Sequence, residues 1–329
     1  MKNAQVVFTQ KEKAALLYAD FDPHPGPGEI VGENVISLIS TGSERGGFTQ
    51  QFSKNAYSMH TGSSSIGRVM AVGEGVTAFN KDDLFYHNEH HDRYVKLKAE
   101  DCLHVPEGAK PEKLIFGRYA AVSMTSIFKM QAKPVDTILV TGQGMVGIMC
   151  ATVMQCFGFR VLAVDPSAER RDIARQVGIV HVGESLKALE AEAHCAGALM
   201  ECSGNEQALY DAIPFLRYGA QVFQIGVPWH KTSEWDAHDL LYQVFYGFIS
   251  IHGGWKWQIP RKSDEFHAHS SYSHIEMAMG LIAQGKITIP ECMYELRDPR
   301  DCDRVYREIT IPRIRPTSMI LDWRKYKED

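Results

Sequence analysis

The stretch Thr137-Ile-Leu-Val-Thr-Gly142-Gln-Gly144-Met-Val-Gly147-Ile-Met-Cys150 decides the fold of this chain. It places a complete G-x-G-x-x-G pattern directly after an apolar strand and at the start of an apolar helix. Gly142 would allow a tight turn, Gly144 would let the backbone approach a pyrophosphate, and Gly147 would let helix and strand pack closely. The free amides and the positive end of the helix dipole then favour the phosphates. The stretch therefore predicts a nucleotide-binding βαβ unit that begins near Thr137; the alternative is a nucleotide-free turn whose glycines serve packing alone.

An acidic residue follows this turn at the spacing that dinucleotide binding requires. Val161-Leu-Ala-Val164 predicts a second strand, and Asp165 comes 21 residues after Gly144 (165 − 144 = 21). A carboxylate at this place accepts hydrogen bonds from the adenine ribose and repels a 2′-phosphate, so NAD is favoured over NADP. Arg170 and Arg171 lie on the next predicted helix and weaken that preference. Further cofactor contacts are expected from Met145, Val146, Cys202 and Gly226.

Apolar strands alternate with helical patterns through the middle of the chain. Strands are predicted at 137–141, 160–164, 179–182, 198–202, 220–225 and 247–252, with the clearest helices at 167–177 and 205–216. This alternation predicts an α/β fold whose doubly wound parallel sheet is covered on both faces. The first 120 residues instead predict short strands separated by turns. Helices at 273–284 and 299–309 and a strand at 317–323 are predicted near the end.

Composition and charge limit the class of partner. The 329 residues suggest two domains, and the net charge of −5 without any basic block argues against nucleic acid and anionic membranes. No apolar run reaches the roughly 18 residues of a membrane span, and the N-terminus lacks the apolar stretch of a signal peptide. The seven cysteines form no C-x-x-C pair and fit reduced thiols. We therefore expect a cytoplasmic protein with a small-molecule substrate.

With these motifs in place, nearly the whole chain resembles the medium-chain dehydrogenase/reductase superfamily, the group of zinc alcohol dehydrogenases and polyol dehydrogenases. Ile66-Gly-Arg-Val-Met-Ala-Val-Gly-Glu-Gly-Val76 matches its G-x-V-x-x-V-G-x-G-V strand and turn, and Asp165-Pro-Ser-Ala-Glu-Arg170 resembles the second-strand end of its NAD-dependent polyol members. The resemblance implies a GroES-like, β-rich substrate domain at residues 1–121 and 259–329 and a Rossmann NAD-binding domain at 122–258. It also implies a homodimer or homotetramer joined through the edge of the Rossmann sheet, for which the apolar strand region Tyr242–Ile251 is a candidate.

The zinc ligands of that superfamily have no counterparts in this sequence. The first Cys would fall within Leu38-Ile-Ser-Thr-Gly-Ser-Glu44, the His-Glu pair at Ser63 and Ser64, and the third ligand near Gly117. The four-cysteine lobe that holds a structural zinc is missing as well. Because a catalytic zinc needs three N, S or O ligands and an open position, we predict no zinc at either site. The run Ile39-Ser-Thr-Gly-Ser-Glu44 resembles a segment of a zinc-lacking branch that includes bacteriochlorophyllide dehydrogenase-like proteins.

Chemistry without the metal requires another acid or base. In the superfamily the segment that corresponds to His87-Asn-Glu-His-His-Asp-Arg-Tyr94 leads into a strand beside the substrate cleft. His90 or His91 is therefore a candidate general base, with a neighbouring carboxylate to orient it; the alternative is a solvated polar turn. Tyr119 is a second candidate, and its alternative is packing at a domain junction.

Polar and aromatic residues are candidates for binding a hydroxylated substrate. Ser43, Ser63 and Ser64 could hydrogen-bond it where zinc would have been, and the alternative is ordinary turn serines. Trp255 and Lys256 follow the sixth Rossmann strand, at the sheet end where open α/β sheets bind ligands. They could contact a sugar face or an anionic group, and the alternative is hydrophobic packing. Three further histidines suggest a metal only loosely, and a solvated loop is the better interpretation: His267, His269 and His274.

The sequence is compatible with three functions. The first is zinc-independent hydride transfer between NAD(H) and a secondary alcohol or ketone, with a polyhydroxylated substrate such as a sugar or cyclitol. The second is NADPH-dependent reduction of a quinone or enone, against which Asp165 argues because zinc-free members with that activity often lack an acid there. The third is a non-catalytic nucleotide-binding protein on a dehydrogenase fold.

Overall fold

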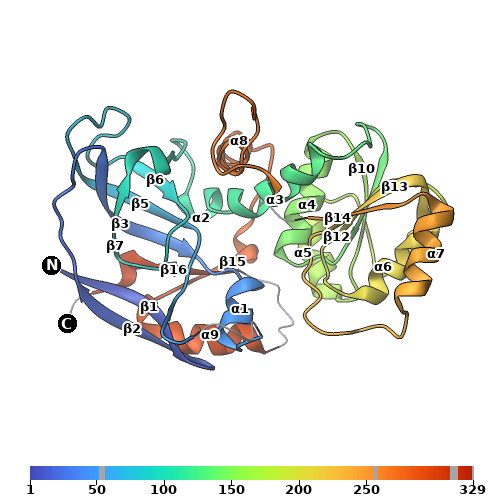
Figure 1. The fold of residues 1–329 in the computed structure, drawn as a ribbon, viewed down its shortest axis with the longest axis horizontal. Coiled ribbons are helices and arrows are strands. Elements are labelled where there is room, and N and C mark those ends of the chain that lie inside the picture. The colour runs from blue at the N-terminus through green and yellow to red at the C-terminus, as the bar shows by residue number, and fades with distance from the viewer. Residues whose placement is uncertain (52–55, 255–257, 312–317, 328–329) are drawn as a thin grey trace. The chain divides into compact units, whose positions relative to one another are not determined.

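The computed structural model describes residues 1–51, 56–254, 258–311 and 318–327, which form two compact units. The first unit contains Met1–Phe116 and most of the chain after Tyr294, and the second contains Gly117–Met293. Figure 1 shows that the first is rich in strands and that the second alternates strands with helices. The predicted α/β class, with a β-rich part and a parallel-sheet part, is confirmed.

This division differs from the predicted domains, 1–121 with 259–329 and 122–258. Residues 259–293 belong to the second unit because α8 (Ser271–Ala283) packs along α3 (Gly117–Ile127). A methyl group at Gly117 would lie 2.9 Å from the side chain of Met279, so the two helices approach closely at that glycine. The second unit therefore extends to Met293, beyond residue 258, and helix packing of this kind leaves no local signal in the chain.

Two sheets build the first unit. The larger has seven strands in the order β15-β16-β3-β5-β6-β8, with β7 paired to β3, and the smaller has the order β2-β1-β4. The strands are β1 (Lys2–Gln10), β2 (Lys13–Asp20), β3 (Glu29–Leu38), β4 (Met59–His60), β5 (Ser65–Val72), β6 (Leu84–His87), β7 (Tyr94–Lys98), β8 (Leu103–His104), β15 (Tyr294–Arg297) and β16 (Ser318–Asp322). The helices of this unit are α1 (Ser43–Phe48), α2 (Pro111–Leu114) and α9 (Cys302–Thr310).

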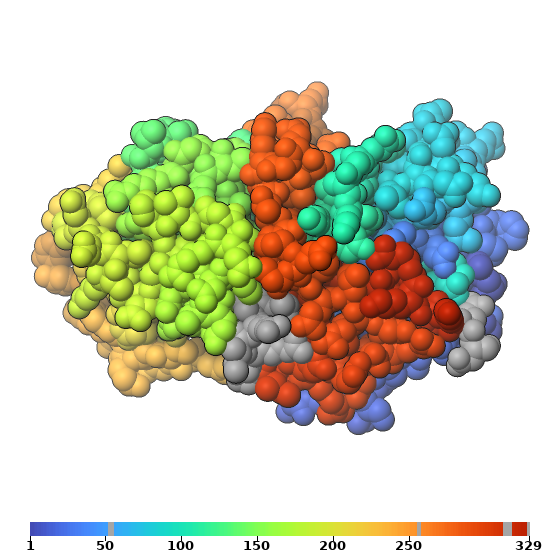
Figure 2. Space-filling model, turned by 180° about the vertical axis from the view of Figure 1, so that it is seen from behind, coloured from blue at the N-terminus to red at the C-terminus, as the bar shows by residue number. Residues whose placement is uncertain are grey.

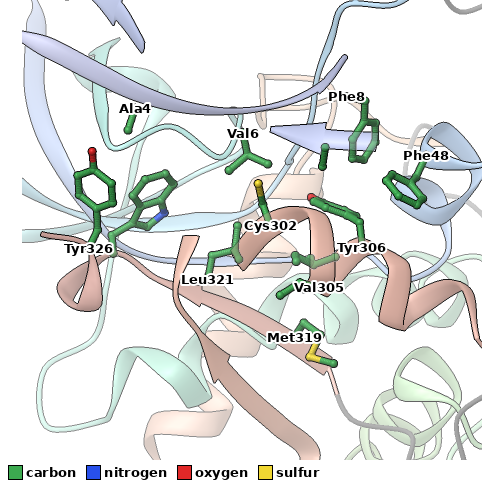
Figure 3. Packing of buried hydrophobic residues seen from close by; sticks show 13 residues of the cluster. Ala4, Val6, Phe8, Phe48, Cys302, Val305, Tyr306, Met319, Leu321 and Tyr326 are labelled. Atoms are coloured by element: carbon green, nitrogen blue, oxygen red, sulfur yellow. The ribbon is translucent and has the colours of Figure 1, made fainter. Parts of the chain in front are cut away.

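A buried apolar cluster joins β1, α1, α9 and β16 within the first unit. Figure 3 shows Phe8, Phe48 and Tyr306 facing one another at one end of it. The ring centroids of Phe8 and Tyr306 lie 4.7 Å apart with the planes nearly perpendicular, a favourable edge-to-face arrangement. Burial of these rings fixes α9 against β1, although they come from opposite ends of the chain.

A six-stranded parallel sheet forms the centre of the second unit, in the order β11-β10-β9-β12-β13-β14. Its strands are β9 (Thr137–Thr141), β10 (Arg160–Val164), β11 (His181–Gly183), β12 (Ala196–Glu201), β13 (Leu216–Gln224) and β14 (Ser250–Gly253). The connecting helices are α4 (Met145–Cys156), α5 (Ala168–Gln176), α6 (Glu206–Ala212) and α7 (Ala237–Gly247). Helices α4 and α5 cover one face and α6 and α7 the other, which is the doubly wound arrangement (Figure 1).

The surface of the second unit comes largely from these connecting segments. Figure 2 shows its rear side, where the yellow-green chain between α4 and β13 forms most of the outer layer. The two central strands beneath are covered on both faces, since every residue of β9 and β12 is buried. No helix in the described ranges is both long and apolar enough to cross a membrane.

The prediction that Tyr242–Ile251 is a strand region is wrong. Tyr242 to Gly247 form the second half of α7, and strand β14 begins only at Ser250. The helix starts with a capping box, in which Asp236 accepts from the amide of Asp239 and Asp239 accepts from the amide of Asp236. That capping signal, together with aromatic residues three and four positions apart, was the sequence evidence for a helix.

Candidate functional site

The glycine turn after β9 has the geometry that the sequence predicts. Gly142 adopts a φ of +80°, which favours glycine. A Cβ at Gly147 would lie 1.7 Å from the carbonyl oxygen of Gly142, so only glycine allows this contact between helix and turn. A Cβ at Gly144 would meet nothing within 4 Å, so the backbone there borders open space. The turn is closed on its sheet side and open on the other.

The first turn of α4 presents free backbone donors at this opening. The first hydrogen bond that enters the helix runs from the amide of Ile148 to the carbonyl of Gly144, at 2.9 Å. Within the described residues, the amides of Met145, Val146 and Gly147 donate to no protein acceptor. Three adjacent amides at the positive end of a helix of 12 residues form a site for an anion such as a pyrophosphate.

Asp165 lies directly beside the turn, at the end of β10. It is 2% exposed, and its Oδ2 accepts from the amide of Gln143 at 2.7 Å while Oδ1 accepts from the amide of Ser167 at 2.8 Å. The guanidinium of Arg170 lies 3.4 Å from Oδ2. The carboxylate therefore braces the turn, and its remaining lone pairs are the ones that a ribose hydroxyl could use.

Cys202 and Gly226 contribute backbone to the same region. The amide of Cys202 donates to the carbonyl of Thr141 at 2.9 Å, and a Cβ at Gly226 would lie 2.2 Å from the nitrogen of Gly204. The hydrogen bond with Cys150, together with burial, raises the pKa of the Cys202 thiol well above its usual value. Cys202 is therefore a neutral thiol, and the hydrogen bond of its backbone amide positions it at this site.

Glu201, which precedes Cys202, is the residue at this site that the sequence reasoning missed. It is a fully buried carboxylate at the end of β12. Its signal was a single acidic residue closing the otherwise apolar run Ala196–Met200, directly before Cys-Ser-Gly. A charge in that position needs hydrogen-bonding partners, which the following turn supplies.

In the first unit, His91 is buried rather than solvated. Its side chain is 0% exposed, and Nε2 lies 3.1 Å from Oε2 of Glu44. The same carboxylate accepts from the hydroxyls of Thr61 and Tyr306 and from the amide of Ser40. Burial alone would raise the pKa of Glu44, but the charge and hydrogen bond of His91 and the other donors lower it overall. The cluster joins α1, the segment before β5, the loop before β7 and α9.

His90 has the opposite environment. It is exposed, and its ring lies 5.5 Å from that of His60, which is also exposed. Asp92, two residues on, accepts from the side chain of Gln5 at 3.0 Å. Burial raises the pKa of Asp92 despite that hydrogen bond. Of the two neighbouring histidines, His90 is the one that solvent and small molecules reach.

Tyr119 and the serines are distributed between the two units. Tyr119 lies in α3 and is 7% exposed. Ser43 is exposed and donates to the hydroxyl of Ser40 at 2.7 Å, whereas Ser64 is buried and donates to the hydroxyl of Tyr86 at 3.1 Å. Ser63 is half-buried. Trp255 and Lys256 lie outside the described residues.

The three histidines near α8 are held by packing and turn contacts. The rings of His269 and His274 stack on Phe128, at 4.0 Å and 4.9 Å between centroids. His274 is 0% exposed, so the expectation of a solvated loop is wrong for that residue. Its solvent-free position follows from the packing of α8 on α3. His267 is exposed and lies 2.8 Å from Asp264.

The residues at the superfamily's zinc positions do not fit a zinc ion. Ser64 uses its hydroxyl on Tyr86, and Gly117 has no side chain to offer. Among the described residues, no group of three or more His, Cys, Asp or Glu side chains could hold a metal. These positions therefore offer zinc no set of ligands, and zinc independence stays a prediction.

Known proteins resemble this chain both in sequence and in fold. A family model described as zinc-binding dehydrogenase matches residues 144–257. L-threonine 3-dehydrogenase of Legionella pneumophila is 29% identical over 49% of this chain and 48% of its own length. D-xylulose reductase A of Aspergillus oryzae is 19% identical over 66% of this chain and 59% of its own length. The chain thus spans about half the length of the curated relatives it matches.

The fold likeness extends over nearly the whole chain. The structure of acetophenone reductase from Geotrichum candidum, solved with NAD, has a TM-score of 0.78 and 18% identity, and the match covers 98% of this chain and 97% of that one. Other solved structures with this fold include a complex with NADP. These matches show a likeness of fold, with one unit rich in strands and one unit built on a doubly wound parallel sheet. In the matched segment and in its fold, the chain is similar to proteins of the medium-chain dehydrogenase/reductase superfamily. Its placement in a zinc-lacking branch stays a prediction.

Proposed function

We propose that this protein is an NAD(H)-dependent oxidoreductase that interconverts a secondary alcohol and a ketone without zinc. The observation that carries the proposal is the set of three free amides, Met145, Val146 and Gly147, above an open glycine turn. The anion that such a site fits best is a pyrophosphate, and the likeness to dehydrogenases supports that of a nicotinamide dinucleotide. A polyhydroxylated substrate, such as a sugar or cyclitol, is supported by the likeness to D-xylulose reductase.

Asp165 supports NAD over NADP. Its carboxylate is held in place by two backbone amides, so it cannot move away from a bulky anion beside it. A 2′-phosphate would meet this fixed negative charge, whereas a ribose hydroxyl could donate to it. Arg170 reduces the penalty because its guanidinium lies 3.4 Å from the carboxylate.

The substrate's proton needs an acceptor when its hydride leaves. The nicotinamide, when bound, takes or gives the hydride. We propose that His90 accepts the proton, because its side chain is exposed. His91 is buried and hydrogen-bonded to Glu44. His91 and Tyr119 then serve as buried positioning residues for the elements that carry them.

Titration of the purified protein with NADH and with NADPH, followed by nicotinamide fluorescence, tests the cofactor assignment. A screen of polyols and cyclitols for NAD reduction, repeated after dialysis against a zinc chelator, tests the reaction and its metal independence. We expect tighter binding of NADH and turnover that survives chelation. Turnover of quinones or enones with NADPH would instead establish the reductase alternative. Binding without turnover of either class would establish a non-catalytic protein.

A further inference from the structure

Glu201 occupies a special place in the parallel sheet. Strand β12, which it ends, lies between β9 and β13, and the chain order of the strands reverses between β9 and β12. In a doubly wound sheet the two halves on either side of that reversal each receive one mononucleotide. Asp165 ends a strand of the half β9-β10-β11, and Glu201 ends a strand of the half β12-β13-β14.

Both oxygens of the Glu201 carboxylate are fully engaged by donors from three strand ends. Oε1 accepts from the hydroxyl of Thr141 at 3.2 Å and from the amide of Ser203 at 2.8 Å, and also from the Ser203 hydroxyl. Oε2 accepts from the amide of Gly204 at 3.1 Å and from the side chain of Gln224 at 2.6 Å. With five donors on a 0% exposed carboxylate, Glu201 has no capacity to bind a ligand itself.

The backbone around Glu201 is packed turn against turn. A Cβ at Gly142 would lie 2.7 Å from Cα of Ser203, and a Cβ at Gly204 would lie 2.5 Å from the carbonyl oxygen of Val227. The carbonyl of Glu201 also accepts from the amides of Ile225 and Gly226, both at 2.8 Å. The loops after β9, β12 and β13 therefore touch one another, and one side chain ties all three together.

We infer that Glu201 is a positioning residue for the half of the site that receives the nicotinamide mononucleotide. The inference rests on the proposed function. Glu201 fixes the turn Ser203–Gly204 and the end of β13, where that half would be received, while Asp165 fixes the adenosine side of the glycine turn. Loss of Glu201 should therefore weaken binding of the dinucleotide through its nicotinamide half and leave binding of the adenosine half unchanged.

Substitution of Glu201 by Gln keeps the shape but breaks this arrangement. The new NH₂ group must face either the amide of Ser203 or that of Gly204, and neither backbone donor can turn away. Substitution of Gln224 by Met is a milder change that removes one donor to Oε2 and retains the side-chain length. It keeps the inference testable if the Glu201 variant folds poorly.

The experiment measures binding of NADH and of AMP, by calorimetry, to the wild type and to Glu201→Gln, Gln224→Met and Glu112→Gln. Glu112 is the matched control, because it is a buried carboxylate of the first unit that pairs with Arg324. Thermal unfolding of each variant is recorded alongside. We expect Glu201→Gln to weaken the binding of NADH about tenfold and the binding of AMP less than about twofold. Gln224→Met should weaken the binding of NADH about threefold. The control lowers thermal stability without changing either affinity.

Two results would overturn the inference. Equal losses of NADH and AMP affinity in Glu201→Gln, or unchanged affinities with a lower unfolding temperature, would reduce Glu201 to a structural residue. In that case wild-type binding of NADH still stands, so the proposed function survives. A wild type that binds neither NADH nor NADPH overturns the proposed function, and this inference with it.

Discussion

Glu44 and His91 lie against each other in the interior of the first unit, with Oε2 of the carboxylate 3.1 Å from Nε2 of the imidazole. They are 47 residues apart in sequence. Tyr306 reaches the same oxygen from α9, so three distant segments meet at one buried charge. Within the described residues Nδ1 of His91 has no partner, which leaves the bond to Glu44 as the contact that fixes the ring.

The change His91→Leu tests whether this pair is structural. It leaves the buried carboxylate with hydroxyl and amide donors but without its imidazole, which costs about 3 kcal/mol of unfolding free energy. Urea unfolding followed by circular dichroism measures that loss. NADH affinity stays unchanged because the glycine turn belongs to the second unit. His60→Leu, on an exposed imidazole, is the control and should change stability little. A His91→Leu protein of wild-type stability that had lost turnover would instead restore His91 as the catalytic base.

The change His90→Asn tests the proposed proton acceptor. Loss of a general base lowers kcat by about a hundredfold or more, while NADH affinity and stability stay close to wild type because the ring is exposed. Steady-state kinetics on the polyol found in the screen measures the effect. His60→Asn removes the neighbouring ring and should leave kcat within about threefold. Full activity of His90→Asn would show that another side chain accepts the proton.

The change Asp165→Asn alters cofactor preference. One of the backbone amides that now donate to the carboxylate, from Gln143 or Ser167, would face the new NH₂ group. We expect NADH to bind about tenfold more weakly and the preference for NADH over NADPH to shrink, because the negative charge that repels a 2′-phosphate is gone. Fluorescence titrations with both nucleotides measure the ratio. An unchanged ratio of NADH to NADPH affinity would show that Asp165 stabilises the turn but does not contact the adenine ribose.

The buried His87 makes stability depend on pH. Burial lowers the pKa of His87 to about 3, with smaller contributions from the charges of His91 and His90. The neutral ring fits its neighbours, since Nδ1 accepts from the amide of Glu89 and Nε2 lies 2.8 Å from Oδ1 of Asn34. In the unfolded chain the imidazole titrates near 6.5, so the unfolded state takes up the proton first as pH falls.

The stabilisation from neutral His87 is therefore complete above pH 6.5 and lost as pH falls from there toward 3. Between pH 6.5 and pH 5 the loss from this one group is about 2 kcal/mol. Urea midpoints at pH 7.5 and pH 5 measure it. His87→Gln, which retains a donor for Asn34 but does not titrate, should show a smaller drop between the two pH values. Equal drops in both proteins would assign the pH dependence to other groups.

The nucleotide half of the fold could be predicted from sequence because its signals are local. Strand, glycine turn and helix are consecutive between Thr137 and Cys156, and β9 and β10 have the bounds that the apolar runs predicted. The network around Glu44 could not be predicted, because its partners come from positions 61, 91 and 306 and nothing local links them. The polar turn containing His90 and His91 looked uniform in sequence, yet folding buries one imidazole and exposes the other.

An apolar surface on α7 and at its C-cap suggests how two copies of the chain would associate. Leu241, Tyr242, Phe245, Tyr246 and Phe248 are each more than half exposed. They precede β14, which in the described part of the sheet pairs only with β13 and so forms its edge. An unpaired parallel edge beside exposed aromatic rings is a liability for an isolated molecule, and a two-fold related copy would cover both.

We therefore predict a homodimer, or a tetramer built from it, joined at α7 and β14. Phe245→Glu, which places a charge on a ring that is 72% exposed, should shift the protein to monomer in light scattering at micromolar concentration. Val180→Glu adds the same charge at a residue 73% exposed elsewhere on the second unit, and it should leave the assembly intact. A monomeric wild type would refute the assembly outright, and a dimeric Phe245→Glu would move the interface to another face. Because the glycine turn and its free amides lie at the ends of β9 and α4, NADH should bind the monomeric variant with unchanged affinity.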